Sequence, residues 1–72
     1  HLLGAAGVTE AVIAAMTLRD QVLPPTINLS HPCADGWDFV RDRERPHPVR
    51  TVLSTSFGFG GHNAALLLTA CE

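Results

Sequence analysis

The first third of the chain carries apolar side chains on nearly every side of a helix. Leu, Ala, Val, Ile and Met dominate residues 2–23, and the polar residues that interrupt them include Thr9, Glu10, Thr17, Arg19 and Asp20. Ala, Leu and Met favour helix, and a helix that is apolar on all sides is normally a buried one. Pro24-Pro25 is expected to end this helix, because proline cannot donate a backbone hydrogen bond.

A chain of 72 residues can hardly supply the cover that such a helix needs. A domain of this size hides only about 60% of the surface that its unfolded chain exposes, and usually adds disulfides or a metal. Cys33 and Cys71 have no spacing that indicates a disulfide framework. Apolar residues also lie close to both ends, at Leu2-Leu3 and Leu66-Leu67-Leu68. We therefore expect one incomplete domain, a piece of a larger protein.

Composition excludes several classes of protein. Hydrophobic residues make up 46% and charged residues 17%, too apolar for a disordered chain. Five arginines among seven acidic residues create no basic surface, so no nucleic-acid partner is expected. No apolar stretch approaches the ~20 residues that span a membrane, and no signal segment opens the chain. We expect no membrane partner and a cytoplasmic location, where free thiols are ordinary.

The rest of the chain predicts a loop followed by a hairpin. Residues 24–48 are loop-like, with a short strand possible at 26–29, apolar anchors at Trp37, Phe39 and Val40, and a solvated surface at 41–45. Residues 52–57 suit a strand. The Ala- and Leu-rich run 64–70 favours helix by composition, but it is too short for a stable free helix and fits a strand hairpin better. Composition alone leaves both open.

The densest motif is Gly58-Phe59-Gly60-Gly61-His62-Asn63. Its glycines permit positive φ and expose backbone N–H groups. It is not a phosphate-binding loop, because no Lys and Ser/Thr follow, and it lacks the spacing of a dinucleotide fingerprint. A tight hairpin turn is the plainer interpretation, although it leaves an aromatic ring on display.

The histidines predict no metal site. His31-Pro32-Cys33 lacks a second ligand pair, which His47 and His62 do not provide, so neither a metal nor a cofactor is expected. His1 differs because it directly precedes the predicted helix, whose dipole favours a neutral imidazole. Such an imidazole can donate to a developing oxyanion or take up a proton, yet a lone histidine can equally be structural.

Three separated segments resemble, in order and spacing, the C-terminal part of the 3-oxoacyl-acyl-carrier-protein synthases, the condensing enzymes (ketosynthases) of fatty-acid and polyketide synthesis. They are residues 1–7, 23–29 and 56–63, which read HLLGAAG, LPPTINL and SFGFGGHN. The resemblance implies an α/β, thiolase-like layered α-β-α-β-α fold, of which this chain is the last buried helix plus closing strands. Residues 1–72 would form the incomplete C-terminal part of a ketosynthase domain.

The resemblance also implies a Cys-His-His site. A cysteine takes the acyl chain as a thioester, and two histidines assist decarboxylation of a malonyl unit on acyl carrier protein. His1 matches the second histidine, expected to hydrogen-bond the malonyl thioester oxygen as the enolate forms. Phe59 matches the gating phenylalanine, whose backbone N–H helps form the oxyanion hole, while Gly58, Gly60 and Gly61 let the gate loop move.

The chain departs from the family pattern at several places. The nucleophilic cysteine, the first histidine and a lysine shortly before His1 belong to segments absent here, and neither Cys33 nor Cys71 matches the nucleophile's motif. His62 stands where many relatives have Thr, and Thr55 where many have Asn.

The function that the resemblance implies is an acyltransferase: decarboxylative Claisen condensation of an acyl thioester with malonyl-acyl carrier protein, in fatty-acid or polyketide biosynthesis. Its partners would be acyl carrier protein and a second subunit, in a homodimer or a ketosynthase-like heterodimer. The alternative is a non-catalytic pairing subunit of the chain-length-factor type, although such a subunit has no need of His1. The chain alone is expected to be inactive.

Overall fold

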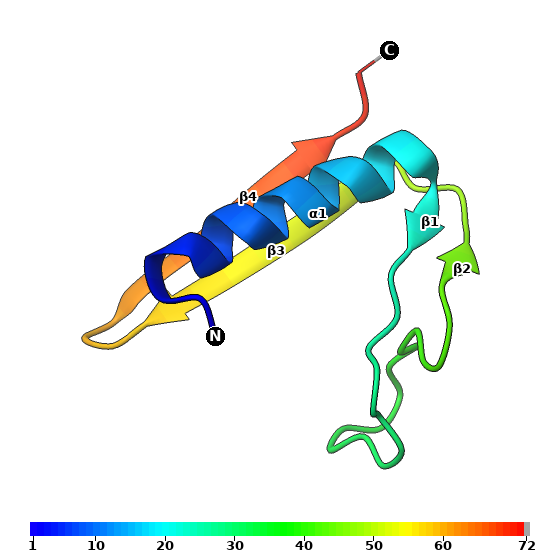
Figure 1. Cartoon of the computed structure of the whole chain (residues 1–72), viewed down its shortest axis with the longest axis horizontal. Helices are drawn as coiled ribbons and strands as arrows, with labels where there is room; N and C mark the ends of the chain where they lie inside the picture. Colours follow the sequence, from blue (N-terminus) through cyan, green and yellow to red (C-terminus); the bar gives the residue numbers. More distant parts are fainter. Residues whose placement is uncertain (72) are drawn as a thin grey trace.

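The computed structural model describes residues 1–71, which form a helix on a β-hairpin with a loop-rich arm at one end (Figure 1). A 3-10 turn, η1 (Leu3–Ala5), continues into α1 (Ala6–Asp20). The strands are β1 (Val22–Leu23), β2 (Arg45–Pro46), β3 (Thr51–Gly58) and β4 (His62–Thr69). The short strands β1 and β2 pair antiparallel, and β3 and β4 form a separate antiparallel hairpin.

The helix ends at Asp20, before the prolines that were expected to end it. Gln21 adopts the left-handed conformation at φ 57°, and its N–H donates to the Thr17 carbonyl oxygen at 2.9 Å. Its side-chain Nε2 donates to the carbonyl oxygens of Leu18 and Val49, at 2.6 and 2.9 Å. Because this side chain closes the helix end and ties it to the segment before β3, the chain turns away before it reaches the prolines.

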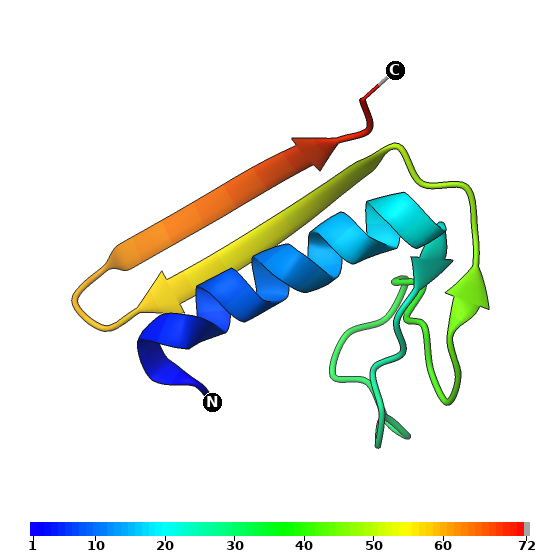
Figure 2. The same ribbon diagram turned by 45° about the horizontal axis from the view of Figure 1, so that its top comes forward.

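The expected burial of the helix on all sides is not found in this chain. Among residues 1–71 only Ala14 and Thr17 are buried, whereas Val8 and Val12 are 67% and 53% exposed. The physical reason is that α1 packs against the hairpin, mainly on β3, and no second layer within the described chain covers its opposite side (Figure 2). No helix among these residues has the length and apolar character needed to cross a bilayer.

The glycine-rich segment forms the predicted hairpin. β3 and β4 stay in register from Thr51 opposite Thr69 to Gly58 opposite His62, and residues 59–61 make the turn. Figure 2 shows this turn at the end of the hairpin nearest the N-terminus. The Ala- and Leu-rich run, open between helix and strand in the sequence, is strand up to residue 69 because β3 pairs with its backbone groups.

The two faces of β3 differ. Val52, Ser54 and Ser56 alternate as half-buried residues, whereas Leu53 and Phe57 are 62% and 77% exposed. Alternate residues of a strand point to opposite faces, so α1 lies over the face that carries the two serines. Small side chains there let the helix approach closely.

The arm between β1 and β3 is loop-like, as predicted, but the short strand at 26–29 is not formed. Thr26 makes only an isolated bridge with Arg41, and Asn28 has φ 64°, which is incompatible with an extended strand. Trp37, expected as an anchor, is 72% exposed, while Phe39 and Val40 are half-buried. Of the charged run 41–45, only Arg45 is not fully on the surface.

Candidate functional site

Two of the segments that carry the resemblance, residues 1–7 and 56–63, lie side by side near the hairpin turn. The N-terminus lies next to the end of β3 in both ribbon views (Figures 1 and 2). His1 and Gly4 from the N-terminal segment, with Phe57 and Gly58 from β3, line one cavity of about 450 Å³. Because α1 and β3 run antiparallel, they bring the N-terminal segment next to the end of β3, which lies far from it in the sequence.

A second cavity of about 550 Å³ adjoins the first, and five of its six lining residues also line the first. His1, Gly58 and Phe59 all line it. The ring of Phe59 is fully exposed, and Gly60 and Gly61 follow it in the adjoining turn. The structure therefore gathers the predicted site residues at one end of the helix–hairpin unit; their chemical roles remain predictions.

The close approach of helix and sheet explains why this space exists. A Cβ added to Gly7 would lie 3.3 Å from Ser56 Oγ, tighter than most real Cβ contacts, so glycine lets α1 rest directly on β3. This contact lies two residues after the end of η1 and two residues before the end of β3. It fixes where the N-terminal segment stands relative to the glycine turn.

Two titratable residues of the cavity wall were not singled out as site residues from the sequence. Glu10 of α1 and His62 of β4 both line the cavity of about 450 Å³. Glu10 follows Gly7 by one helical turn, so helical periodicity alone could have placed it on this face. His62 pairs with Gly58, so the hairpin register could have placed it at the site.

The glycine turn depends on backbone conformations that favour glycine. Gly60 and Gly61 both have φ 82°, which L-residues rarely adopt. Of the turn residues, Phe59 lines the cavity of about 550 Å³, and the backbone N–H groups of the turn are donors of the kind that can bind an anion.

The thiols lie away from this site. Cys33 is exposed in the arm, and Cys71 is exposed beyond the end of β4 that is opposite the turn. Within residues 1–71, the His, Cys, Asp and Glu side chains form no cluster that could hold a metal ion.

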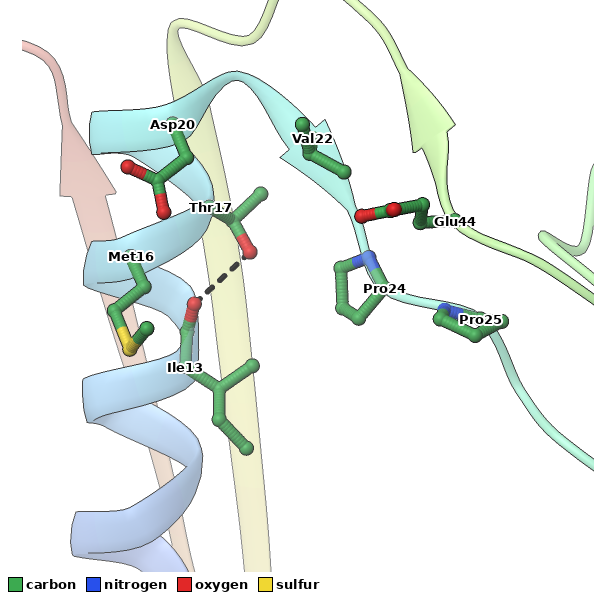
Figure 3. Close-up of a pocket in the computed structure, with 8 residues that line it drawn as sticks. All are labelled: Ile13, Met16, Thr17, Asp20, Val22, Pro24, Pro25 and Glu44. Carbon is green, nitrogen blue, oxygen red and sulfur yellow. Dashed lines mark hydrogen bonds between the residues drawn. The ribbon is translucent and has the colours of Figure 1, made fainter.

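Another cavity, of about 250 Å³, lies at the opposite end of α1 (Figure 3). Its wall is mostly apolar, with Ile13, Met16 and the prolines of the arm, and two of its polar side chains, Thr17 and Asp20, have partners within the chain. Thr17 Oγ1 donates to the Ile13 carbonyl oxygen at 2.9 Å, and Asp20 pairs with Arg19 at 2.7 Å. Hydrogen bonding from Arg19 also lowers the pKa of Asp20. This end offers packing rather than chemistry.

Known proteins match this chain over almost its whole length. Residues 1–30 match the family model "Beta-ketoacyl synthase, C-terminal domain". The chain is 48% identical over 69 residues to 3-oxoacyl-[acyl-carrier-protein] synthase 2 of Rhizobium meliloti (strain 1021), an alignment that covers 94% of this chain and 16% of that protein. The proteins of the same name in Coxiella burnetii and Vibrio cholerae are 49% and 50% identical, over 96% and 93% of this chain and 17% of each relative.

The chain thus spans about one sixth of the length of the curated relatives that it matches. The matched family model begins at His1 and includes η1 and α1, and the alignments with the relatives extend over nearly all of the remaining chain. On these similarities, the chain matches the C-terminal part of beta-ketoacyl synthases over nearly its whole length.

Proposed function

We propose that residues 1–72 are the incomplete C-terminal part of a ketosynthase domain with the thiolase-like fold. The longer protein would catalyse decarboxylative Claisen condensation of an acyl thioester with malonyl-acyl carrier protein. The observation that carries this proposal is the placement of His1 and Phe59 around one cavity, in a chain about half identical to 3-oxoacyl-[acyl-carrier-protein] synthases.

In the proposed reaction, His1 donates a hydrogen bond to the malonyl thioester oxygen. The malonyl carboxylate leaves as carbon dioxide, and the electron pair of the broken C–C bond forms the enolate that His1 stabilises. The enolate carbon then attacks the acyl thioester carbon, a C–C bond forms, and the cysteine leaves as a thiolate. The exposed position of His1, ahead of η1 and α1, suits this role because the helix end favours negative charge.

Phe59 would contribute twice to the same site. Its backbone N–H would help bind the oxyanion formed when the cysteine is acylated, and its ring would act as the gate that orders acyl loading before malonyl entry. Full exposure of the ring at the cavity edge supports a movable gate. Gly58, Gly60 and Gly61 would supply the backbone freedom of that movement.

The nucleophilic cysteine and the first histidine would come from the longer protein, so the chain alone should be inactive. No cofactor takes part in this scheme. Acyl carrier protein would deliver both thioesters in the cytoplasm, to a homodimer or a ketosynthase-like heterodimer, for fatty-acid or polyketide synthesis. A non-catalytic pairing subunit is the second candidate, and the location of His1 on the cavity wall favours the enzyme.

A chimera tests the proposal directly. The segment of the Rhizobium meliloti synthase that aligns with this chain is replaced by residues 1–72, and condensation, cysteine acylation and malonyl decarboxylation are measured separately. We expect condensation in the chimera, and we expect His1→Ala to lower malonyl decarboxylation by about 10²–10³-fold while acylation largely survives.

His47→Ala is the matched control, because His47 is exposed in the arm and should leave both half-reactions unchanged. Equal loss of acylation and decarboxylation in His1→Ala would show a structural role for His1. A properly folded chimera without condensation would contradict the proposed function.

A further inference from the structure

His62 directly follows the glycine turn, and its imidazole folds back over Gly60. A Cβ built on Gly60 would lie 3.6 Å from Cδ2 and 3.7 Å from Nε2 of His62. The ring therefore lies beside Gly60, at ordinary van der Waals distance from the position that a side chain there would occupy.

Gly58 faces the same residue. A Cβ there would lie 3.3 Å from the His62 carbonyl oxygen and 3.4 Å from its Cβ, and the two residues are paired across the hairpin. Phe59 therefore stands between two glycines that both lie against His62.

We propose that His62 is a positioning residue for the turn 59–61: its imidazole braces Gly60 and so sets the direction of the Phe59 N–H and ring. The role rests on the proposed function, because it acts through Phe59. Two consecutive positive-φ glycines leave a turn with many accessible conformations unless something outside the backbone restricts it. The imidazole ring supplies that restriction.

A second explanation is that the His62 imidazole exchanges protons in the cavity, which His1 and Glu10 also line. The two explanations require different chemical properties of the residue 62 ring. Bracing uses contacts of ring atoms with the position beside Gly60, which a flat uncharged ring of similar size can also make. Proton exchange requires an imidazole.

The experiment compares His62→Ala with His62→Phe in the chimera of residues 1–72 with the Rhizobium meliloti synthase. Amide hydrogen exchange at residues 59–61 reports the order of the turn without any need for catalysis. The rates of cysteine acylation and malonyl decarboxylation, each with kcat and KM, report the effect on Phe59. His47→Ala is again the control.

We expect His62→Ala to speed amide exchange in the turn and to lower kcat for acylation by about 10-fold, because a misplaced donor weakens oxyanion binding. Decarboxylation should change less, since it depends on His1. His62→Phe should restore both exchange and acylation to nearly the parent values.

Three results would overturn the inference: no change in exchange with His62→Ala, faster exchange with unchanged acylation, or a defect in His62→Phe as large as in His62→Ala. The last would assign the role to imidazole chemistry. Because exchange is measured independently, a chimera that fails to condense still tests the bracing: unchanged exchange rejects it, and a change that His62→Phe reverses supports it.

Discussion

The two ends of α1 are held in opposite ways. At the C-terminal end, the Gln21 side chain donates to the carbonyl oxygens of Leu18 and Val49 and accepts from the Val49 N–H, at 2.6 to 2.9 Å. At the N-terminal end, the helix packs closely on β3 because Gly7 has no side chain where it lies against Ser56. Directional hydrogen bonds fix one end, and close backbone approach shapes the other.

This difference indicates that one end of α1 anchors the helix and that the other end carries the proposed chemistry. The end that carries His1 and Phe59 has open cavities and a turn in which two of the three residues are glycines. The end that carries Gln21 has its polar groups satisfied within the chain. Substitutions at the first end should therefore change activity, and substitutions at the second should change stability.

The largest expected effect lies in the glycine turn. Gly60→Val in the chimera places a β-branched side chain at φ 82°, a conformation that L-residues rarely adopt, at a cost of roughly 1–3 kcal/mol. Because the strain displaces the neighbouring Phe59 N–H, acylation should fall by about 10²-fold. Phe59→Ala keeps that N–H, so it should weaken the order of loading and lower acylation much less.

The measurement is acyl-enzyme formation and condensation, determined separately for the two variants of the turn. Acylation abolished by Phe59→Ala but intact in Gly60→Val would show that the ring, and not the backbone, carries the oxyanion function. The separation of roles within the turn would then be wrong.

The next effect concerns the anchoring end. Gln21→Ala removes three hydrogen bonds that are partly buried, so the chimera should lose about 2 kcal/mol of unfolding free energy. Gln21→Glu is the matched variant: it keeps an acceptor for the Val49 N–H but puts a carboxylate oxygen opposite the Leu18 and Val49 carbonyl oxygens at the negative end of the helix dipole, so its loss should be at least as large.

Thermal or denaturant unfolding measures this loss, and acylation and decarboxylation are followed in parallel. Both half-reactions should stay close to the parent values at a temperature where the variants are folded. A selective loss of decarboxylation in Gln21→Ala would show that the two ends of α1 are coupled, contrary to the comparison.

Sequence alone predicted the parts of the fold that local chemistry decides. The β-branched and aromatic residues of 52–57 and the glycines of the turn indicate a hairpin, which the structure contains as β3 and β4. The end of α1 was not predictable, because it depends on a bond from Gln21 to Val49, far along the chain. The predicted burial of the helix on all sides is not found in this chain, because one hairpin covers one face only, and it stays a prediction for the longer protein.

The candidate site, like the fold, could be predicted only in part from the sequence. His1 and Phe59 came from the resemblance, and no pattern of spacing placed them together; the antiparallel packing of α1 on β3 does so. The contact of His62 with Gly60 depends on a side-chain rotamer, which sequence patterns do not report. Local motifs thus located the residues, and packing determined their neighbours.

The smallest expected effect lies in the arm beside the anchoring end. Arg45 of β2 donates to the Asp38 carboxylate at 2.7 and 3.1 Å, and this hydrogen bonding lowers the pKa of Asp38 below its usual range. A carboxyl group whose pKa is lower in the folded state adds stability above its unfolded pKa, near 3.9, and loses it as the pH falls through the folded value. The pair is exposed, so this contribution is small.

Asp38→Asn should therefore flatten the acid limb of the stability profile slightly, below about pH 4, and leave stability near pH 7 almost unchanged. The measurement is Tm of the chimera and of its Asp38→Asn variant between pH 7 and the acid limit of folding, with salt kept constant. Asp35→Asn is the matched control, since Asp35 is exposed in the same arm. An Asp38→Asn loss as large as that of Gln21→Ala would mean that the charge pair, and not the amide side chain, anchors this end of the helix.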